Sequence, residues 1–429
     1  MMMHRGFRNL ALTAAGLACC LTAQPGQAAT QAQEIELLKR QVEALMQQNQ
    51  ALSKRISEME QRQTPAVTDT SDRTAIKEEV ARQIEEQKGK GFQVPNINEH
   101  ITLSGSFEGD FKAGKNFDGA HTSEFNVDTI DLFLGFQVNE WVKGLMVIEY
   151  TDDDDDIFVD EAHVTLGGTE TFPFFLTGGK IYAPFGDFST NMLQDPLTQT
   201  LGEINDSGVI VGFEQNGFKA TVFAYNGIDE GDPDNDTINS YGASLSYSYE
   251  QDEMGVNAGI AWVNNLGDAE GFDDADVFTK DNPAGPDEPK LLYTCSEVDG
   301  LALNLGGKYG PFSVIFEYVT ALNSFHYADK IHYGESGAKP AAFNSELAYT
   351  TQLFDKETTF AVGYQKSWEA VALELPEHRY IGAASMGILA GTTVILEYFY
   401  DENYSESDGR PSEQNGHGYG FTTRLRYEF

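Results

Sequence analysis

The chain of 429 residues carries 67 acidic and 28 basic side chains, which gives a formal net charge of −39 at pH 7. A surface this acidic repels phosphates, so the composition argues against a nucleic-acid partner. Aromatic residues make up 12% of the chain and glycine is abundant, which favours strands and turns over helices.

The N-terminal residues have the pattern of an export signal. Basic side chains at residues 4–8 precede the apolar run Leu10–Ala23, which is too short for a membrane helix of about 20 residues. The small residues that follow predict cleavage and a signal peptide over residues 1–28. Cys19 and Cys20 raise a lipoprotein signal as the alternative, although neither follows the residues that a lipobox requires.

Residues 31–63 have a heptad period, which predicts a periplasmic coiled coil. The a and d positions of its four heptads are Ile35, Leu38, Val42, Leu45, Asn49, Leu52, Ile56 and Met59. The alternative is a lone amphipathic helix that packs on its own chain. A single Asn at an a position with Leu at d favours a dimer, whereas large open barrels are trimers by analogy. We expect a homo-oligomer, with a trimer as the first possibility.

Residues 64–100 are expected to be a linker that contains one short helix. Thr64–Asp72 has the composition of a linker, and apolar residues at helical spacing follow it at Ile76, Val80 and Ile84. The glycines and proline of Gly89–Asn96 then end the helical pattern.

From Ile101 onward the hydrophobic period is two, which is typical of strands with one apolar face. Ile101–Phe111 and Ile130–Val138 show the alternation clearly, and sixteen such segments fit between Ile101 and Phe429. In the second of these segments the apolar row consists of Ile130, Leu132, Leu134 and Phe136.

The links between these segments alternate between tight and long. The tight links are Asn139–Glu140, Gln215–Asn216, Gly310–Pro311 and Ala390–Gly391, and the long polar links are residues 113–121, 183–206, 227–239, 264–300, 321–340 and 401–417. Outer-membrane barrels sort their links in this way, with short periplasmic turns and long external loops. We therefore predict an all-β membrane protein, a closed antiparallel transmembrane β-barrel of about 16 strands over residues 101–429, preceded by an α-helical coiled coil.

The last segment, Gly418–Phe429, has an aromatic row and a polar row. In a closed barrel the aromatic row faces lipid, with Tyr and Phe near the membrane interfaces, and Arg424 and Arg426 face the lumen. A barrel of sixteen strands leaves a water-filled channel, whereas a plugged active transporter needs 22 strands. The sequence thus predicts a porin in the outer membrane of a Gram-negative bacterium, in contact with lipid and lipopolysaccharide.

A family resemblance is carried by two stretches together with the predicted coiled coil. The stretches are "VDEAHVTLGG" (Val159–Gly168) and "TGGKIYAPFGDFSTNMLQDPLTQTLGE" (Thr177–Glu203). Together they resemble the siderophore porin family first associated with legiobactin uptake in gamma-proteobacteria. The resemblance covers essentially the whole mature chain and implies an outer-membrane barrel that lets a ferric siderophore through. It implies no particular binding residues.

No catalytic or nucleotide-binding motif is present in the sequence: HExxH, GxSxG, a P-loop and CxxC are all absent. We therefore expect neither an enzyme nor a cofactor. Three possible metal ligands, His326, Asp329 and His332, share one predicted loop, but ordinary loop polarity is the better explanation for them.

Two acidic stretches raise the question of calcium or other divalent cations. Asp232–Asp236 opens like a calcium loop, but Thr237 and Ala243 stand where Gly and Glu are needed. Asp152–Asp156 is expected to be a solvated hairpin tip, with cations shared with lipopolysaccharide as the alternative. We predict no metal site.

Charged groups in the lumen set porin selectivity. Alternation gives as inward candidates Lys143, Lys180, Lys219, Lys308, Arg379, Arg424 and Arg426. Residues 183–206 are the candidate for an infolded constriction, with carboxylates at Asp187, Asp195 and Glu203. The cations either attract an anionic ferric complex, with Lys180 and Arg379 in the narrow zone, or pair with lumen carboxylates such as Glu149 and Glu161.

Four functions compete on this basis. The first is a passive porin biased toward a ferric siderophore, and the second is a porin for other small anionic or nutrient solutes. The third is a structural tether in which the barrel anchors the coiled coil in the membrane. The fourth, and weakest, is a soluble adhesin-like β protein.

Overall fold

The computed structural model describes residues 100–152, 156–227, 238–274, 297–326, 331–333 and 336–429. The predicted signal peptide, coiled coil and most of the linker lie outside these residues. No helix in the described part is long and apolar enough to cross a membrane.

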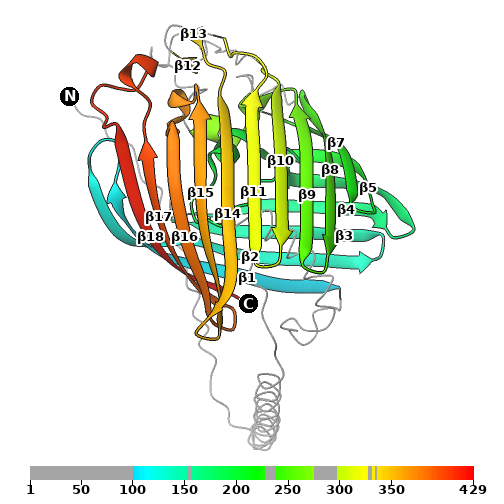
Figure 1. Ribbon diagram of the computed structural model, residues 1–429. Coiled ribbons are helices and arrows are strands. Elements are labelled where there is room, and N and C mark those ends of the chain that lie inside the picture. Colours follow the sequence, from blue (N-terminus) through cyan, green and yellow to red (C-terminus); the bar gives the residue numbers. More distant parts are fainter. Residues whose placement is uncertain (1–99, 153–155, 228–237, 275–296, 327–330, 334–335) are drawn as a thin grey trace, which may run out of the picture. The chain divides into compact units, whose positions relative to one another are not determined.

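Sixteen antiparallel strands close into one barrel (Figure 1). They are β1 (Ile101–Lys115), β2 (His121–Asn139), β3 (Val142–Thr151), β4 (Asp156–Thr169), β5 (Phe172–Tyr182), β6 (Asn205–Gln215), β7 (Phe218–Tyr225), β8 (Ser240–Gln251), β9 (Met254–Val263), β10 (Gly300–Tyr309), β11 (Phe312–Ala321), β14 (Ala341–Leu353), β15 (Lys356–Trp368), β16 (His378–Leu389), β17 (Thr392–Glu402) and β18 (His417–Glu428). The predicted fold class, strand number and closure are confirmed.

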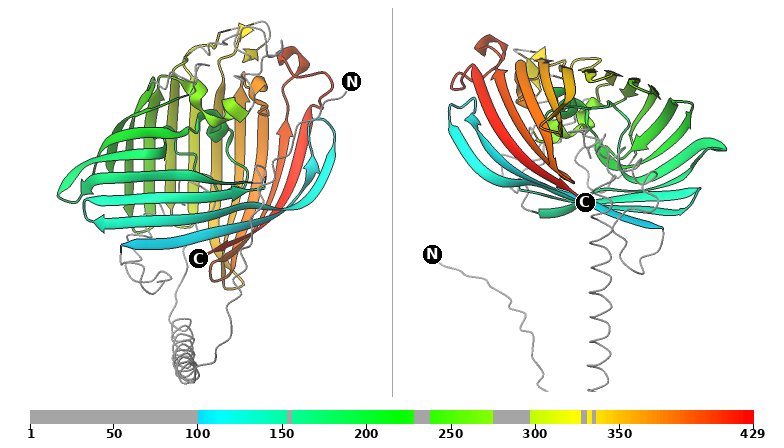
Figure 2. Two further views of the ribbon diagram at one scale, coloured as in Figure 1. Left: turned by 180° about the vertical axis from the view of Figure 1, so that it is seen from behind. Right: turned by 60° about the horizontal axis from the view of Figure 1, so that its bottom comes forward.

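The remaining elements are short and belong to the links. They are the helices α3 (Leu197–Gly202) and α4 (Glu270–Asp274), the strand pair β12 (His332–Tyr333) and β13 (Ser336–Gly337), and 3₁₀ turns at Leu266–Asp268, Val371–Leu373 and Glu406–Asp408. α3 lies in the link between β5 and β6, inside the barrel (Figure 2).

The first and last strands pair with each other and close the sheet. Phe107 lies opposite Tyr427, and Asp110 lies opposite Arg424. The pairing continues past β18, because the Phe429 N–H donates to the Gly105 carbonyl at 3.1 Å and the Phe429 carbonyl accepts from the Gly105 N–H at 3.2 Å. A closed sheet leaves no unpaired strand edge, which lipid would not tolerate.

The links are sorted as the sequence predicted. The seven tight links have two residues each: 140–141, 170–171, 216–217, 252–253, 310–311, 354–355 and 390–391. Two of the tight links, predicted at Asn139–Glu140 and Gln215–Asn216, each lie one residue later in the structure. The turn after β6 is Asn216–Gly217, with φ of 54° and 81°, and Asn-Gly is the pair that a type I′ hairpin turn prefers.

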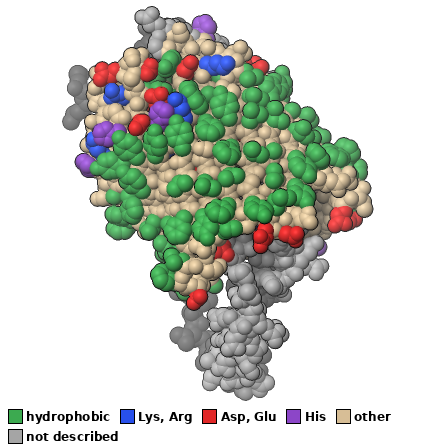
Figure 3. Space-filling model, viewed as in Figure 1, with side chains coloured by type: hydrophobic (Ala, Val, Ile, Leu, Met, Phe, Trp, Pro, Cys, Tyr) green, Lys and Arg blue, Asp and Glu red, His purple; other side chains and the backbone are tan. Residues whose placement is uncertain are grey.

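The outer face of the barrel is apolar, as expected. On β2, Ile130 is 40% exposed, whereas the neighbouring Phe133 is 5% exposed and points inward. Leu132, Leu134 and Phe136 share the row of Ile130. Hydrophobic side chains cover the strands in a broad band, with charged side chains above and below it (Figure 3).

The lumen holds a hydrophobic core of its own. Residues 183–204, here called the constriction loop, fold back into the barrel between β5 and β6. Phe185, Leu197 and Leu201 of this loop are at most 1% exposed and pack against inner-wall residues that include Val319 and Ala342. The loop therefore fills the part of the lumen beside these later strands.

The links at the long-loop end contact one another. Tyr333 donates a hydrogen bond to Asp408 across two links, at 3.0 Å between the hydroxyl and a carboxylate oxygen. Side-chain hydrogen bonds from Ser405 and Tyr333 lower the pKa of Asp408. Tyr404 is 3% exposed, and burial raises its pKa to about 12. Its hydroxyl lies 2.7 Å from that of Ser367, which ties the last long link to β15.

Candidate pore constriction

Three glutamates on the inner wall hold the constriction loop. Glu317 on β11, Glu346 on β14 and Glu397 on β17, here called the latch glutamates, are each at most 3% exposed. Their carboxylates accept hydrogen bonds from the loop backbone at Asp187 (2.7 Å), Phe188 (3.2 Å), Asn191 (2.8 Å), Leu193 and Gln194 (3.1 Å). The backbone N–H groups of a loop inside a barrel are not paired by the hydrogen bonds of the sheet. Leaving one of them unpaired costs about 1–3 kcal/mol. The latch glutamates remove that cost and fix the loop's position.

Additional contacts anchor the loop between the latches. Gln365 on β15 accepts a hydrogen bond from the Leu197 N–H at 3.1 Å, where α3 begins. Thr198 donates to Glu317 at 2.8 Å. Met192 is fully buried in a second apolar cluster with residues of β14, β15 and β16, among them Ile381. The loop is thus held by both polar and apolar contacts.

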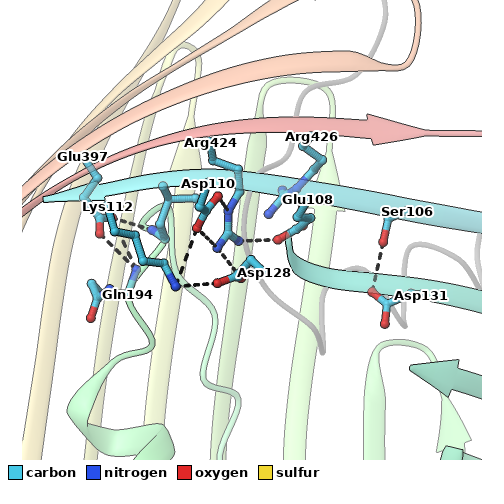
Figure 4. A network of polar contacts seen from close by, with 11 residues as sticks. Ser106, Glu108, Asp110, Lys112, Asp128, Asp131, Gln194, Glu397, Arg424 and Arg426 are labelled. Atoms are coloured by element: carbon cyan, nitrogen blue, oxygen red, sulfur yellow. Dashed lines mark hydrogen bonds and ion pairs between the residues drawn. The ribbon is translucent and has the colours of Figure 1, made fainter. Parts of the chain in front are cut away.

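A network of six charged side chains lies on β1, β2 and β18 (Figure 4). This wall network consists of Glu108, Asp110, Lys112, Asp128, Arg424 and Arg426. Arg424 donates to both oxygens of Asp110, each at 2.8 Å, and also to Glu108 and Asp128. Lys112 lies 2.6 Å from Asp128. Three cations and three carboxylates therefore neutralise each other.

A cavity of about 380 Å³ lies between the constriction loop and this network. Its lining includes Leu193, Gln194 and Asp195 from the loop. The opposite side is lined by residues of β1, β2 and β18, including Asp110 and Arg424. This cavity is the candidate for the narrow part of a pore.

Arg379 on β16 also lines the cavity, and it too is paired. Its guanidinium binds Asp401 through two hydrogen bonds, of 2.9 and 3.0 Å. A third contact, of 3.5 Å, reaches the Asp195 carbonyl, and the group lies 5.2 Å from the centre of the Phe399 ring. The three arginines Arg379, Arg424 and Arg426 are thus each paired with a lumen carboxylate.

The three carboxylates expected in the constriction have different positions. Asp195 lines the cavity. Asp187 instead ties the loop to the wall, because one of its oxygens accepts from Asn257 at 2.7 Å and from Asn304 at 3.0 Å. Glu203 is 6% exposed and accepts from Gln199 at 3.0 Å inside the loop.

The placement of Lys180 on the inner face was wrong. Lys180 lies opposite Ala162 and Ser207, on the same row of β5 as Phe174 and Leu176, which are 52% and 42% exposed on the outer surface. The inner residue next to it, Ile181, is apolar and 4% exposed. An apolar residue on the inner row removes the polar signal that normally marks that row.

The other predicted lysines lie on inner rows but away from the cavity. Lys143, Lys219 and Lys308 stand one or two residues from the tight turns, and they do not belong to the cavity lining. Arg426 binds Glu108 at 2.6 Å behind Arg424. Of the seven predicted cations, Arg379 and Arg424 line the cavity.

Sequence reasoning missed the latch glutamates and the acidic half of the wall network. A signal for two of the latches exists, since Glu317 and Glu397 each sit at an inner position among apolar residues, in "VIFEYV" and "VILEYF". A charge in such a place needs a partner, and the partner here is the loop backbone. Glu346 has the polar neighbours Asn344 and Ser345, in "NSELAY", and gives no such signal.

Metal candidates receive no support from the part of the chain that the structure covers. Among those residues, no group of three or more His, Cys, Asp or Glu side chains is arranged to hold a metal ion. Asp329 and Asp232–Asp236 lie outside the described ranges.

Comparison with curated proteins finds uncharacterised relatives, and no family model matches the chain. A UPF0422 protein of Coxiella burnetii is 28% identical over 333 residues, which cover 75% of this chain and 68% of the relative. A UPF0422 protein of Legionella pneumophila strain Philadelphia 1 is 26% identical over 334 residues, covering 73% of this chain. The chain spans 61% of the length of the Legionella relative.

Comparison with solved structures identifies the fold. OprB of Pseudomonas putida aligns with a TM-score of 0.51 at 9% identity, over 77% of this chain and 94% of OprB. OmpF of Salmonella typhi, in complex with daunomycin, aligns with a TM-score of 0.50 at 12% identity, over 77% of this chain and 97% of OmpF. The chain therefore has the closed sixteen-stranded barrel fold of outer-membrane porins and is similar in sequence to UPF0422 proteins.

Proposed function

We propose that this protein is a passive porin of the outer membrane of a Gram-negative bacterium. The observation that carries the proposal is the cavity of about 380 Å³ between the constriction loop and the wall network, inside a closed barrel with an apolar outer face. A small polar solute crosses such a pore if it is attracted weakly enough to leave again. The latch glutamates keep the loop against one wall, so that the other side of the lumen can conduct.

Recording from the purified protein in planar lipid bilayers tests this proposal. We expect discrete, ohmic conductance steps whose size grows with salt concentration. The control is a barrel preparation unfolded by boiling before reconstitution. If the folded protein inserts into bilayers without carrying current, the structural tether becomes the better proposal.

The finer proposal is that the solute is a ferric siderophore. Its support is the resemblance of Thr177–Glu203, which spans the end of β5 and nearly all of the constriction loop. A deletion strain should then grow more slowly than its parent on one defined ferric siderophore as sole iron source, and equally well on free iron salts. Equal growth of both strains on every siderophore would favour a porin for other small solutes.

The predicted coiled coil gives a separate expectation about assembly. Deleting residues 31–63 should weaken the homo-oligomer and leave the barrel folded, because the heptad seam supplies self-association and the barrel closes within one chain. Native mass in detergent, before and after deletion, measures the change. A truncated protein that keeps the full oligomeric mass would place the subunit contacts in the barrel instead.

A further inference from the structure

The charged side chains that line the cavity include more carboxylates than cations. The carboxylates in the lining belong to Asp110, Asp128, Asp195 and Glu374, and the cations are Lys112, Arg379 and Arg424. The lining therefore carries one more negative than positive group. Because the walls exclude water, these charges act on a passing ion more strongly than charges on the external loops do.

The guanidinium of Arg424 has little binding capacity left. Its five N–H donors make four bonds to the carboxylates of Glu108, Asp110 and Asp128. Arg379 is occupied in the same way, with two bonds to Asp401 and a third to the Asp195 carbonyl. An anion in the cavity would have to displace a carboxylate that is already held at short range.

The third cation of the lining, Lys112, makes a hydrogen bond of 2.6 Å to Asp128. A carboxylate offers about four lone-pair sites on its two oxygens. Asp128 accepts a hydrogen bond from Lys112 on one oxygen and from Arg424 on the other. Glu374 has an exposed side chain at the edge of the same cavity. A cation in the cavity can therefore contact the exposed carboxylate of Glu374.

We propose that the constriction selects for cationic solutes. This inference rests on the proposed porin function and replaces the expectation that an anionic ferric carboxylate is attracted there. Under it, a ferric complex with net positive charge passes more readily than a negatively charged complex of the same size. K⁺ and Cl⁻ serve as probes of this charge selectivity, because they are small ions of opposite charge.

The decisive measurement is the reversal potential of the full-length protein in a planar bilayer under a KCl gradient. The wild-type protein should be more permeable to K⁺ than to Cl⁻. In the variant Asp128→Asn the wall network becomes net positive and releases donors of Lys112 and Arg424. We expect the K⁺/Cl⁻ permeability ratio to fall about sevenfold, because one unit charge about 7 Å from the ion path in water changes the energies of K⁺ and Cl⁻ by about RT each, in opposite directions.

A matched control removes the same charge from the same strand. Asp131 lies on the inner face of β2, hydrogen-bonded to Ser106 at 3.0 Å and set apart from the cavity (Figure 4). Asp131→Asn should change the ratio much less than Asp128→Asn. Glu374→Gln is a second test variant, since the side chain of Glu374 is exposed and lines the cavity, and it should also lower the ratio.

The outcomes separate the two proposals. A conducting wild-type protein that prefers Cl⁻ overturns the cation selectivity and leaves the porin function standing. Equal ratios for the Asp128 and Asp131 variants, with Glu374→Gln also unchanged, overturn it as well. A folded protein that carries no current at all overturns the porin function and the selectivity with it.

Discussion

Replacing Glu397 with Gln is expected to loosen the constriction loop and raise the single-channel conductance. The two oxygens of Glu397 accept from two successive backbone N–H groups, those of Leu193 and Gln194. A glutamine must turn its own NH₂ group toward one of these donors, so one hydrogen bond is lost and two donors face each other. Hydrogen bonds to charged groups contribute about 1.5–3 kcal/mol each, enough to shift a loop between held and released states.

Single-channel recording of Glu397→Gln measures this effect. We expect larger mean current and added fluctuation between levels, and a greater effect when Glu346→Gln is combined with it. Glu214→Gln is the control, because Glu214 stands on the inner row of β6 beside the turn at Asn216–Gly217 and makes the same change in charge outside the loop contacts. Conductance traces of Glu397→Gln that match those of the control would show that the apolar packing alone holds the loop.

Replacing Leu132 with Arg should impair barrel assembly. Leu132 lies on the outer row of β2, opposite Gly105 on β1 and Ile148 on β3. An arginine on the lipid face near the middle of the membrane costs about 2–4 kcal/mol, against about 0–1 kcal/mol near an interface. Denaturant titration of folding into lipid vesicles gives the difference in free energy from the wild type.

Tyr309→Arg is the matched control for that measurement. Tyr309 also faces outward and is 73% exposed, but it stands beside the tight turn at Gly310–Pro311, at the end of the strand. The same substitution should therefore cost little there. If both variants fold with wild-type stability, the assigned lipid face is wrong, and if both fail equally, depth in the membrane is not the cause.

The barrel itself could be predicted from the sequence because two patterns recur along the chain. These are the period-two alternation of apolar residues and the alternation of tight turns with long links. Alternation places Ile130 outward and Phe133 inward, and each tight turn confirms the register of the strands on both sides. An error in one strand does not change the closed sheet. In β18 an aromatic row alternates with a polar row, which predicted that Arg424 and Arg426 face the lumen. Their bonds to Asp110 and Glu108 in the wall network confirm this.

The constriction was harder to predict because it depends on contacts between distant residues. Lys180 was misplaced because the inner row beside it carries the buried apolar residue Ile181, so polarity does not distinguish the two faces of β5 there. The pairing of Arg379 with Asp401 follows from their being neighbours across β16 and β17, which needs the exact register. Period-two alternation assigns a face to each residue but does not identify its partner.

The latch glutamates also determine the order in which the lumen can take its final form. Asp187, Asn191 and Leu193 are separated from their acceptors by 130, 155 and 204 residues along the chain. The last acceptor, Glu397, belongs to β17, the strand next to the one that closes the barrel. An incomplete barrel that lacks β17 cannot seat the whole loop, so narrowing of the lumen is coupled to completion of the wall. The lumen can therefore reach its final width only once nearly the entire sheet is in place, and we expect so non-local a structure to fold slowly.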